Sequence, residues 1–130
     1  SLAIALKIND NVSFFEPVKS IEKKYLESSI YVMSSRYEGF GMVLIEAMAC
    51  GVPCVSFDCP YGPSDIIADG EDGFLVANGD IDLLAQKLVL LIEDDALRTK
   101  MGNNAKDNVK RFLPETICNQ WDALFKSLLS

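Results

Sequence analysis

Histidine is absent from the 130-residue sequence. Its absence excludes, within this chain, a Ser-His-Asp hydrolase, a Cys-His protease and a zinc site with histidine ligands. Basic residues are also few, since 12 Lys and Arg stand against 19 Asp and Glu and give a formal charge of −7. A chain this acidic is poorly suited to binding nucleic acid or to a polybasic contact with anionic lipid.

Long apolar runs are missing as well, because no stretch approaches the roughly 20 residues that span a bilayer. A zinc pattern is missing too, because the spacing of the four cysteines matches none. We therefore expect plain thiols in a reducing cytosol, in a protein that is cytoplasmic or peripheral to a membrane. The composition is that of one globular domain, with 49% hydrophobic and 24% charged residues. The four cysteines are Cys50, Cys54, Cys59 and Cys118.

The first part of the chain alternates between strand-like and helix-like segments. This alternation predicts an α/β fold in which helices flank a parallel sheet. The expected strands cover residues 11–18, 30–34, 53–57 and 73–77. The expected helices cover 19–28, with Ile21, Tyr25 and Leu26 facing inward, then 41–50 and 62–68.

After residue 78 only helices are expected, and they form a helical C-terminal tail. Asp80 is a plausible N-cap for the first of them, whose apolar residues follow helical spacing. A second helix is expected over 95–112, with a break near Gly102. Pro114 opens the last helix, and its apolar stripe predicts that Trp121 lies in the core.

The stretch 38–53 is the most informative part of the sequence. Apolar helix formers run almost unbroken from 41 to 50, so we expect a buried helix with Glu46 inside it and Glu38 just before it. The free N–H groups at the start of such a helix form an anion site. Gly39 and Gly41 let the backbone approach a ligand closely and adopt positive φ. Two carboxylates beside an anion site are suited to accepting hydrogen bonds from hydroxyl groups.

Glu38-Gly-Phe-Gly-Met-Val-Leu-Ile-Glu46 resembles the E-x7-E signature of retaining glycosyltransferases of the GT-B fold, in particular family four. The resemblance continues through Cys54–Asp58 and the block from Gly62 to Val76, and it covers most of the chain from about Asn11. It implies a Rossmann-like domain that forms the C-terminal, donor-binding half of a GT-B fold.

The resemblance also implies a role for each matching position. Glu38 would be the catalytic residue, facing the transferred sugar, and Glu46 would bind the ribose hydroxyls. The remaining donor-binding positions are Gly39, Phe40 and Gly41 for the sugar, Met42 and Val43 for the diphosphate, and Pro17 and Val18 for the base.

The implied reaction moves a sugar from a nucleotide-diphosphate sugar to an acceptor hydroxyl with retention at the anomeric carbon. Arg36 and the Gly62-Pro-Ser-Asp-Ile-Ile sequence favour a UDP-sugar. We expect no metal requirement, because the helix start supplies positive potential and Asp80-Ile-Asp82 is interpreted as a helix cap. We also expect 1–130 to be a single nucleotide-sugar-binding domain from a larger two-domain enzyme, inactive alone. The glycan or lipid-linked acceptor would bind the other domain.

Other interpretations stay open at this point. Glu38 could be a charge that favours the helix start, and Glu46 could pair with Arg36 in a structural salt bridge. The domain could also be a catalytically silent nucleotide-binding or protein-interaction module of the same fold. A nicotinamide dehydrogenase is disfavoured because no Gly-x-Gly-x-x-Gly follows a strand.

Overall fold

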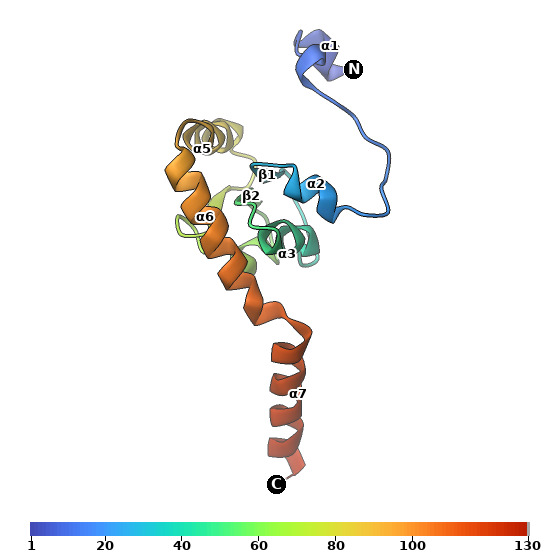
Figure 1. The fold of residues 1–130 in the computed structure, drawn as a ribbon, viewed down its shortest axis with the longest axis vertical. Helices are drawn as coiled ribbons and strands as arrows, with labels where there is room; N and C mark the ends of the chain where they lie inside the picture. The colour runs from blue at the N-terminus through green and yellow to red at the C-terminus, as the bar shows by residue number, and fades with distance from the viewer. Residues whose placement is uncertain (130) are drawn as a thin grey trace.

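The computed structural model describes residues 1–129. An α/β body occupies the centre of the molecule, and both ends of the chain extend away from it (Figure 1). The short helix α1 (Leu2–Ala5) lies apart at one end, and α7 (Pro114–Leu129) projects at the other. Among the described residues, no helix is both long enough and apolar enough to cross a membrane.

The body is built on three parallel strands in the order β1 (Tyr31–Met33), β2 (Cys54–Asp58) and β3 (Gly73–Ala77). In the central strand, Val55 pairs with Val32 on one side and with Phe74 on the other. The first four residues of β2 are buried. The predictions of three strands near 30–34, 53–57 and 73–77, and of their parallel pairing, are therefore confirmed.

The fourth expected strand, over residues 11–18, does not form. A short 3-10 helix, η1 (Asn9–Asn11), precedes an extended segment that pairs with no strand among residues 1–129. The side chain of Phe14 is 80% exposed. The apolar pattern predicted a strand, but a strand also needs a neighbouring edge to satisfy its backbone groups, and this segment curves away from the sheet (Figure 1).

Helices cover both faces of the sheet. They are α2 (Glu22–Leu26), α3 (Met42–Ala49), α4 (Pro63–Ile66), α5 (Ile81–Glu93) and α6 (Asp95–Asn108), which continues into the 3-10 turn η2 (Val109–Phe112). The core beside α3 contains Leu44, Met48 and Cys54. The core beside α5 contains Val55 and Leu91. Successive side chains of β2 thus point to opposite faces of the sheet and pack into two separate cores.

Two predictions about the helices are wrong in detail. Of the three residues expected to face inward from α2, only Tyr25 is buried, whereas Ile21 and Leu26 are exposed. A helix of five residues is too short to bury a full stripe. The expected break at Gly102 is also absent, because α6 runs through it without interruption.

Gly102 is in fact a packing residue. A Cβ atom added to it would lie 2.2 Å from the carbonyl oxygen of Gly51, at the end of α3. The absence of a side chain therefore allows α6 to approach the backbone after α3.

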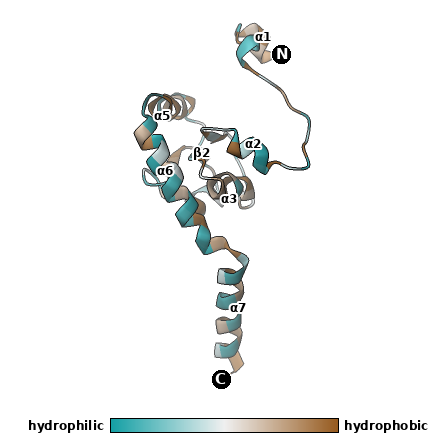
Figure 2. Cartoon of the chain, viewed as in Figure 1, coloured by the Kyte–Doolittle hydropathy of each residue, from teal (hydrophilic) through white to brown (hydrophobic). Residues whose placement is uncertain are grey.

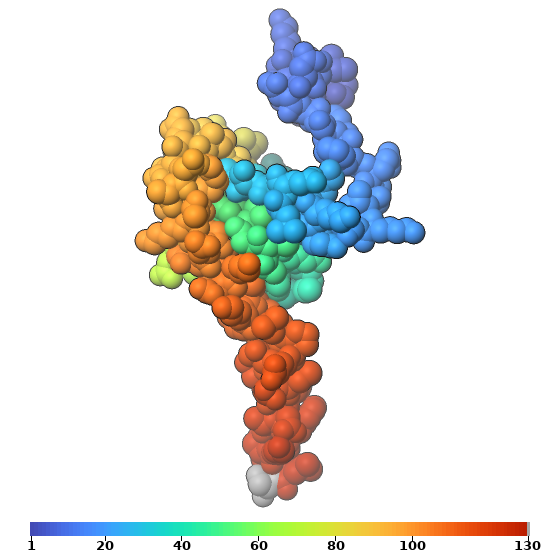
Figure 3. All heavy atoms as spheres, in the orientation of Figure 1, coloured from blue at the N-terminus to red at the C-terminus, as the bar shows by residue number. Residues whose placement is uncertain are grey.

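The last helix differs from its prediction as well. Trp121 and Phe125 are each 54% exposed, so Trp121 does not lie in a core. Their rings contact each other, with centroids 5.6 Å apart. Figure 3 shows α7 standing clear of the body, and Figure 2 shows hydrophobic residues interspersed along it. The spacing correctly predicted an amphipathic helix, but spacing alone does not determine what covers the apolar face.

Candidate functional site

The helix α3 begins directly after a glycine in the left-handed region. Gly41 has φ 96° and ψ 45°, a conformation that residues with a side chain rarely adopt. The N–H of Leu44 bonds back to the Gly41 carbonyl at 2.9 Å. The N–H groups of Met42 and Val43 come before the first intrahelical partner, as at any helix start, so this end of α3 can bind an anion.

Glu46 lies on α3 and is exposed, so the prediction that it is buried is wrong. Its carboxylate accepts a hydrogen bond from the buried phenol of Tyr25, with 3.1 Å between Oη and Oε2. No ion pair joins Glu46 to Arg36 within residues 1–129, so the alternative of a structural salt bridge is not supported. The contact orients Glu46 from α2 and leaves the rest of its carboxylate open to a ligand.

Tyr25 is suited to this contact because it remains a hydrogen-bond donor. Burial raises the pKa of the phenol well above its usual value, and the hydrogen bond to Glu46 and the charge of Glu46 raise it further. The sequence indicated only that Tyr25 faces inward, and nothing in the spacing linked it to Glu46, 21 residues away. Only the packing of α2 against α3 brings the two together.

Glu38 lies half-buried in the loop between β1 and α3. Tyr31 of β1 lies near both carboxylates. Burial raises the pKa of Tyr31 most strongly, with smaller contributions from Cys54, Glu38 and Glu46. The ring of Tyr31 meets that of Tyr25 edge to face, with centroids 5.6 Å apart. Glu46 thus contacts this aromatic pair through Tyr25, and the charges of both Glu38 and Glu46 act on Tyr31.

The loop 39–41, between the two carboxylates, packs against Gly62 and Phe112 through Phe40. Gly62, with φ 104°, packs so closely that an added Cβ atom would lie 1.8 Å from the carbonyl oxygen of Phe40. The ring of Phe40 meets that of Phe112 edge to face at 5.9 Å. Of the two glycines expected to use positive φ, Gly41 does so, whereas Gly39 does not and has open space around it.

Pro17 and Val18 lie in the extended segment before α2, and not at the end of a strand as expected. They line a cavity of about 460 Å³, together with Phe15, Glu16, Ile21, Lys24 and Ser28. The ammonium group of Lys24 lies 4.3 Å from the centre of the Phe15 ring. Because Lys24 adjoins Tyr25, the short helix α2 contributes both to this cavity and to the support of Glu46. Lys24 was not predicted as a site residue. The available signal was its position, next to Lys23, on the polar face of the amphipathic helix expected over 19–28.

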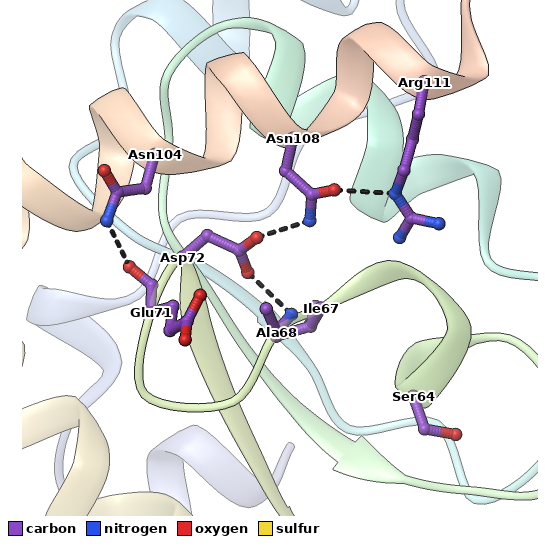
Figure 4. A pocket seen from close by; sticks show the side chains of 8 residues that line it. All are labelled: Ser64, Ile67, Ala68, Glu71, Asp72, Asn104, Asn108 and Arg111. Carbon is purple, nitrogen blue, oxygen red and sulfur yellow. Dashed lines mark hydrogen bonds between the residues drawn. The ribbon is translucent and has the colours of Figure 1, made fainter.

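A second cavity, of about 560 Å³, lies between the segment after α4 and the helical segment α6–η2 (Figure 4). Asp72 is 2% exposed there and accepts hydrogen bonds from Asn108 and, at 2.9 Å, from the N–H of Ala68. Burial raises the pKa of Asp72, while these two hydrogen bonds oppose the shift. Residues 70–72 form a turn, and this network anchors it.

The cysteines are plain thiols and Asp80 is a helix cap, as predicted. All four cysteines are free; Cys54 and Cys59 are buried, Cys50 is partly buried and Cys118 is exposed. Asp80 caps α5, since its carboxylate accepts a hydrogen bond from the N–H of Leu83 at 2.9 Å. Within the described part of the chain, no cluster of three or more cysteine or acidic side chains could hold a metal ion.

A parallel sheet flanked by helices, with a helix that begins at a glycine between Glu38 and Glu46, is the arrangement expected of a GT-B glycosyltransferase domain. The chain belongs to the family of glycosyl transferases group 1, whose model matches residues 1–108. The predictions of family and fold class are therefore confirmed.

Individual proteins agree with this assignment. A poly(ribitol-phosphate) alpha-N-acetylglucosaminyltransferase of Staphylococcus aureus is 37% identical over 88% of this chain and 24% of its own length. An exopolysaccharide phosphotransferase of Streptomyces coelicolor is 36% identical over the whole chain and 14% of its own length. The chain thus spans less than a quarter of the length of each of these two relatives.

Solved structures share the fold. A TarM variant from S. aureus, solved with fondaparinux, alpha-GlcNAc-glycerol and UDP, has a TM-score of 0.88 at 33% identity, over 95% of this chain and 25% of that one. Anabaena HepE in complex with UDP has a TM-score of 0.89 at 28% identity, over 96% of this chain and 35% of that one.

Proposed function

We propose that this chain is the donor-binding domain of a retaining glycosyltransferase that uses a UDP-sugar. The observation that carries the proposal is the start of α3, where a left-handed glycine presents free N–H groups between Glu38 and the Glu46 held by Tyr25. The UDP in the solved structures of TarM and HepE supports uridine as the base.

The two carboxylates have separate tasks in this proposal. Glu46, oriented by Tyr25, accepts hydrogen bonds from the ribose hydroxyls, and Glu38 accepts them from the sugar beside the reacting carbon. The backbone N–H groups of Gly39, Phe40 and Gly41 also address the sugar. The base lies near Pro17 and Val18, in the cavity beside Lys24. Carboxylates suit these tasks because they are pure acceptors when ionised.

The helix start promotes departure of the nucleotide diphosphate. As the bond from the sugar to the diphosphate breaks, negative charge develops on the leaving oxygens. The N–H groups of Met42 and Val43 and the positive end of α3 stabilise that charge in fixed positions. A divalent cation is not required in this mechanism.

The acceptor and the activity of a whole protein are part of the same proposal. The acceptor hydroxyl, on a glycan or a lipid-linked glycan, reaches the donor from a part of the protein outside these 130 residues. A cytoplasmic location, with or without peripheral attachment to a membrane, fits a nucleotide-sugar donor.

A second candidate is a nucleotide-binding domain that performs no sugar transfer. It is favoured by the phosphotransferase of S. coelicolor, which shares the whole of this domain yet carries the name of a different activity.

Calorimetric titration with UDP, GDP and their sugar conjugates tests the proposal. Wild type should bind UDP and UDP-sugars in preference to the guanosine ligands. Glu46→Ala should weaken UDP and UDP-sugar binding alike, by about 1–3 kcal/mol, because a charged hydrogen bond is lost. Glu38→Ala should weaken only the sugar-bearing ligand.

Glu93→Ala provides a matched control, because this exposed glutamate lies at the end of α5 and has no role in the proposed site. Its affinities should equal those of wild type. Unchanged affinities in both site variants, accompanied by lower melting temperatures, would show that the two glutamates are structural. Equal binding of all nucleotides would contradict the preference for uridine.

A further inference from the structure

We propose that Arg111 is a positioning residue for the loop 39–41, which it holds through two separate routes. The inference rests on the proposed function, because this loop is the segment assigned there to the sugar. Arg111 lies in η2, where its guanidinium contacts the C-terminal end of α4, and its own side chain is not proposed to contact the donor.

The first route runs through α4. This four-residue helix leaves its last carbonyl groups without intrahelical partners. The guanidinium of Arg111 donates to the carbonyls of Asp65 at 2.6 Å and of Ile66 at 3.1 Å. A cation at the C-terminal end of a helix is also favoured by the helix dipole. Arg111 thereby fixes α4 from its C-terminal end.

The N-terminal end of α4 contacts the loop 39–41. Gly62, the residue before α4, packs against the backbone of Phe40 with no room for a Cβ atom. A displacement of α4 is therefore transmitted directly to the carbonyl of Phe40, because two backbones in such contact cannot move independently.

The second route runs through two aromatic rings. The guanidinium carbon of Arg111 lies 4.1 Å from the centre of the Phe112 ring, and Phe112 meets Phe40 edge to face. Arg111 thus supports Phe40 at its backbone through α4 and at its ring through Phe112.

The arginine itself is fixed by the buried network of the second cavity. Its Nε donates to the side chain of Asn108 at 2.6 Å, and Asn108 in turn donates to the buried Asp72 (Figure 4). An exposed guanidinium held at three points is more rigid than a free surface arginine. This rigidity is what a positioning role requires.

The test compares Arg111→Ala with wild type by amide NMR without any ligand, and then by titration with UDP and a UDP-sugar. The amide signals of Gly39, Phe40 and Gly41 should shift. The amides of Asp65 and Ile67, which are hydrogen-bonded within α4, should exchange faster with solvent. Amides of Val55 and Phe57 in β2 should keep their protection. Affinity for the UDP-sugar should fall about tenfold, and affinity for UDP should fall less.

Lys110→Ala is the matched control. It removes a cation from the same turn, together with a surface pair to Asp107, but does not touch α4. Its loop signals and affinities should match those of wild type. Arg111→Lys keeps the charge but loses the planar pair of donors, so its loss of UDP-sugar affinity should be partial. It also tests the proposal if Arg111→Ala does not fold.

The ligand-free measurements separate this inference from the proposed function. Loop signals that do not move, or faster exchange in β2 as much as in α4, would overturn the positioning role whatever the chain binds. If the loop signals and α4 respond as expected while wild type binds no nucleotide, the positioning of the loop stands and the proposed function fails.

Discussion

At the scale of single residues, the buried phenol of Tyr25 and the buried carboxylate of Asp72 each have a hydrogen-bond partner distant in sequence. No buried side-chain nitrogen or oxygen among residues 1–129 lacks a hydrogen-bond partner. Glu46 is linked to Tyr25, and Asp72 to Asn108. Unpaired, such groups would cost the full penalty of desolvation, so their partners are as important as the groups themselves.

Asp72 predicts a pH dependence of stability. Its pKa in the folded protein is raised above the ordinary value of an aspartic acid, chiefly by burial. Between the unfolded and the folded pKa, the folded state binds more protons than the unfolded state. The free energy of unfolding therefore falls as pH rises through that interval.

Urea unfolding of wild type and of Asp72→Asn, measured from pH 3 to pH 7, tests this prediction. The contributions of the other carboxylates to the free energy of unfolding cancel when the two proteins are compared at the same pH. The stability of wild type relative to Asp72→Asn should decline as pH rises. Parallel curves would show that Asp72 titrates alike in the folded and unfolded states.

At the scale of elements, close backbone approach determines where the helices lie. Gly62 allows α4 to contact the loop 39–41, and Gly102 allows α6 to contact the end of α3. Helix propensity predicts neither of these contacts, because it records only that glycine destabilises the interior of a helix.

Gly102→Ala should therefore destabilise the protein, by about 1–3 kcal/mol, because its new methyl group would collide with the carbonyl of Gly51. In an unobstructed helix the same change stabilises by roughly 0.5–1 kcal/mol. The sign of the change in unfolding free energy thus distinguishes a packing glycine from a helix breaker. Asn103→Ala, at the exposed neighbouring position, should have little effect.

At the scale of the whole molecule, the body and α7 differ in their degree of burial. The body has two cores, one on each face of the sheet. None of the described residues of α7 is classed as buried, although its apolar residues follow helical spacing.

This exposed stripe should cause the chain to self-associate at high concentration, since large apolar patches are rarely left in water. Sedimentation velocity should show a mass that rises with concentration. Trp121→Gln combined with Phe125→Gln should reduce that rise, whereas Asn119→Ala on the same helix should not. A monomer at all concentrations would contradict the prediction.

The sequence predicted most of the central α/β unit because local signals agree there. Gly51, in the left-handed region, follows the end of α3, and Asp80 caps α5. The segment 11–18 shows the limit of such signals, because its residues suit a strand but strand formation depends on a partner that local sequence does not specify. Trp121 shows the same limit for helices, since its spacing predicts an apolar face but not its burial.

The sequence by itself determined the parallel α/β class and the helix that begins at a glycine between Glu38 and Glu46, because these depend on local pattern and turn chemistry. Its motifs also carried the resemblance to the family. Only the tertiary structure decided that Tyr25 orients Glu46, that Gly62 contacts Phe40 and that Arg111 joins α4 to η2. Each of these contacts joins residues more than 20 positions apart. Such pairs are selected by the packing of whole elements, which no periodicity within one element encodes.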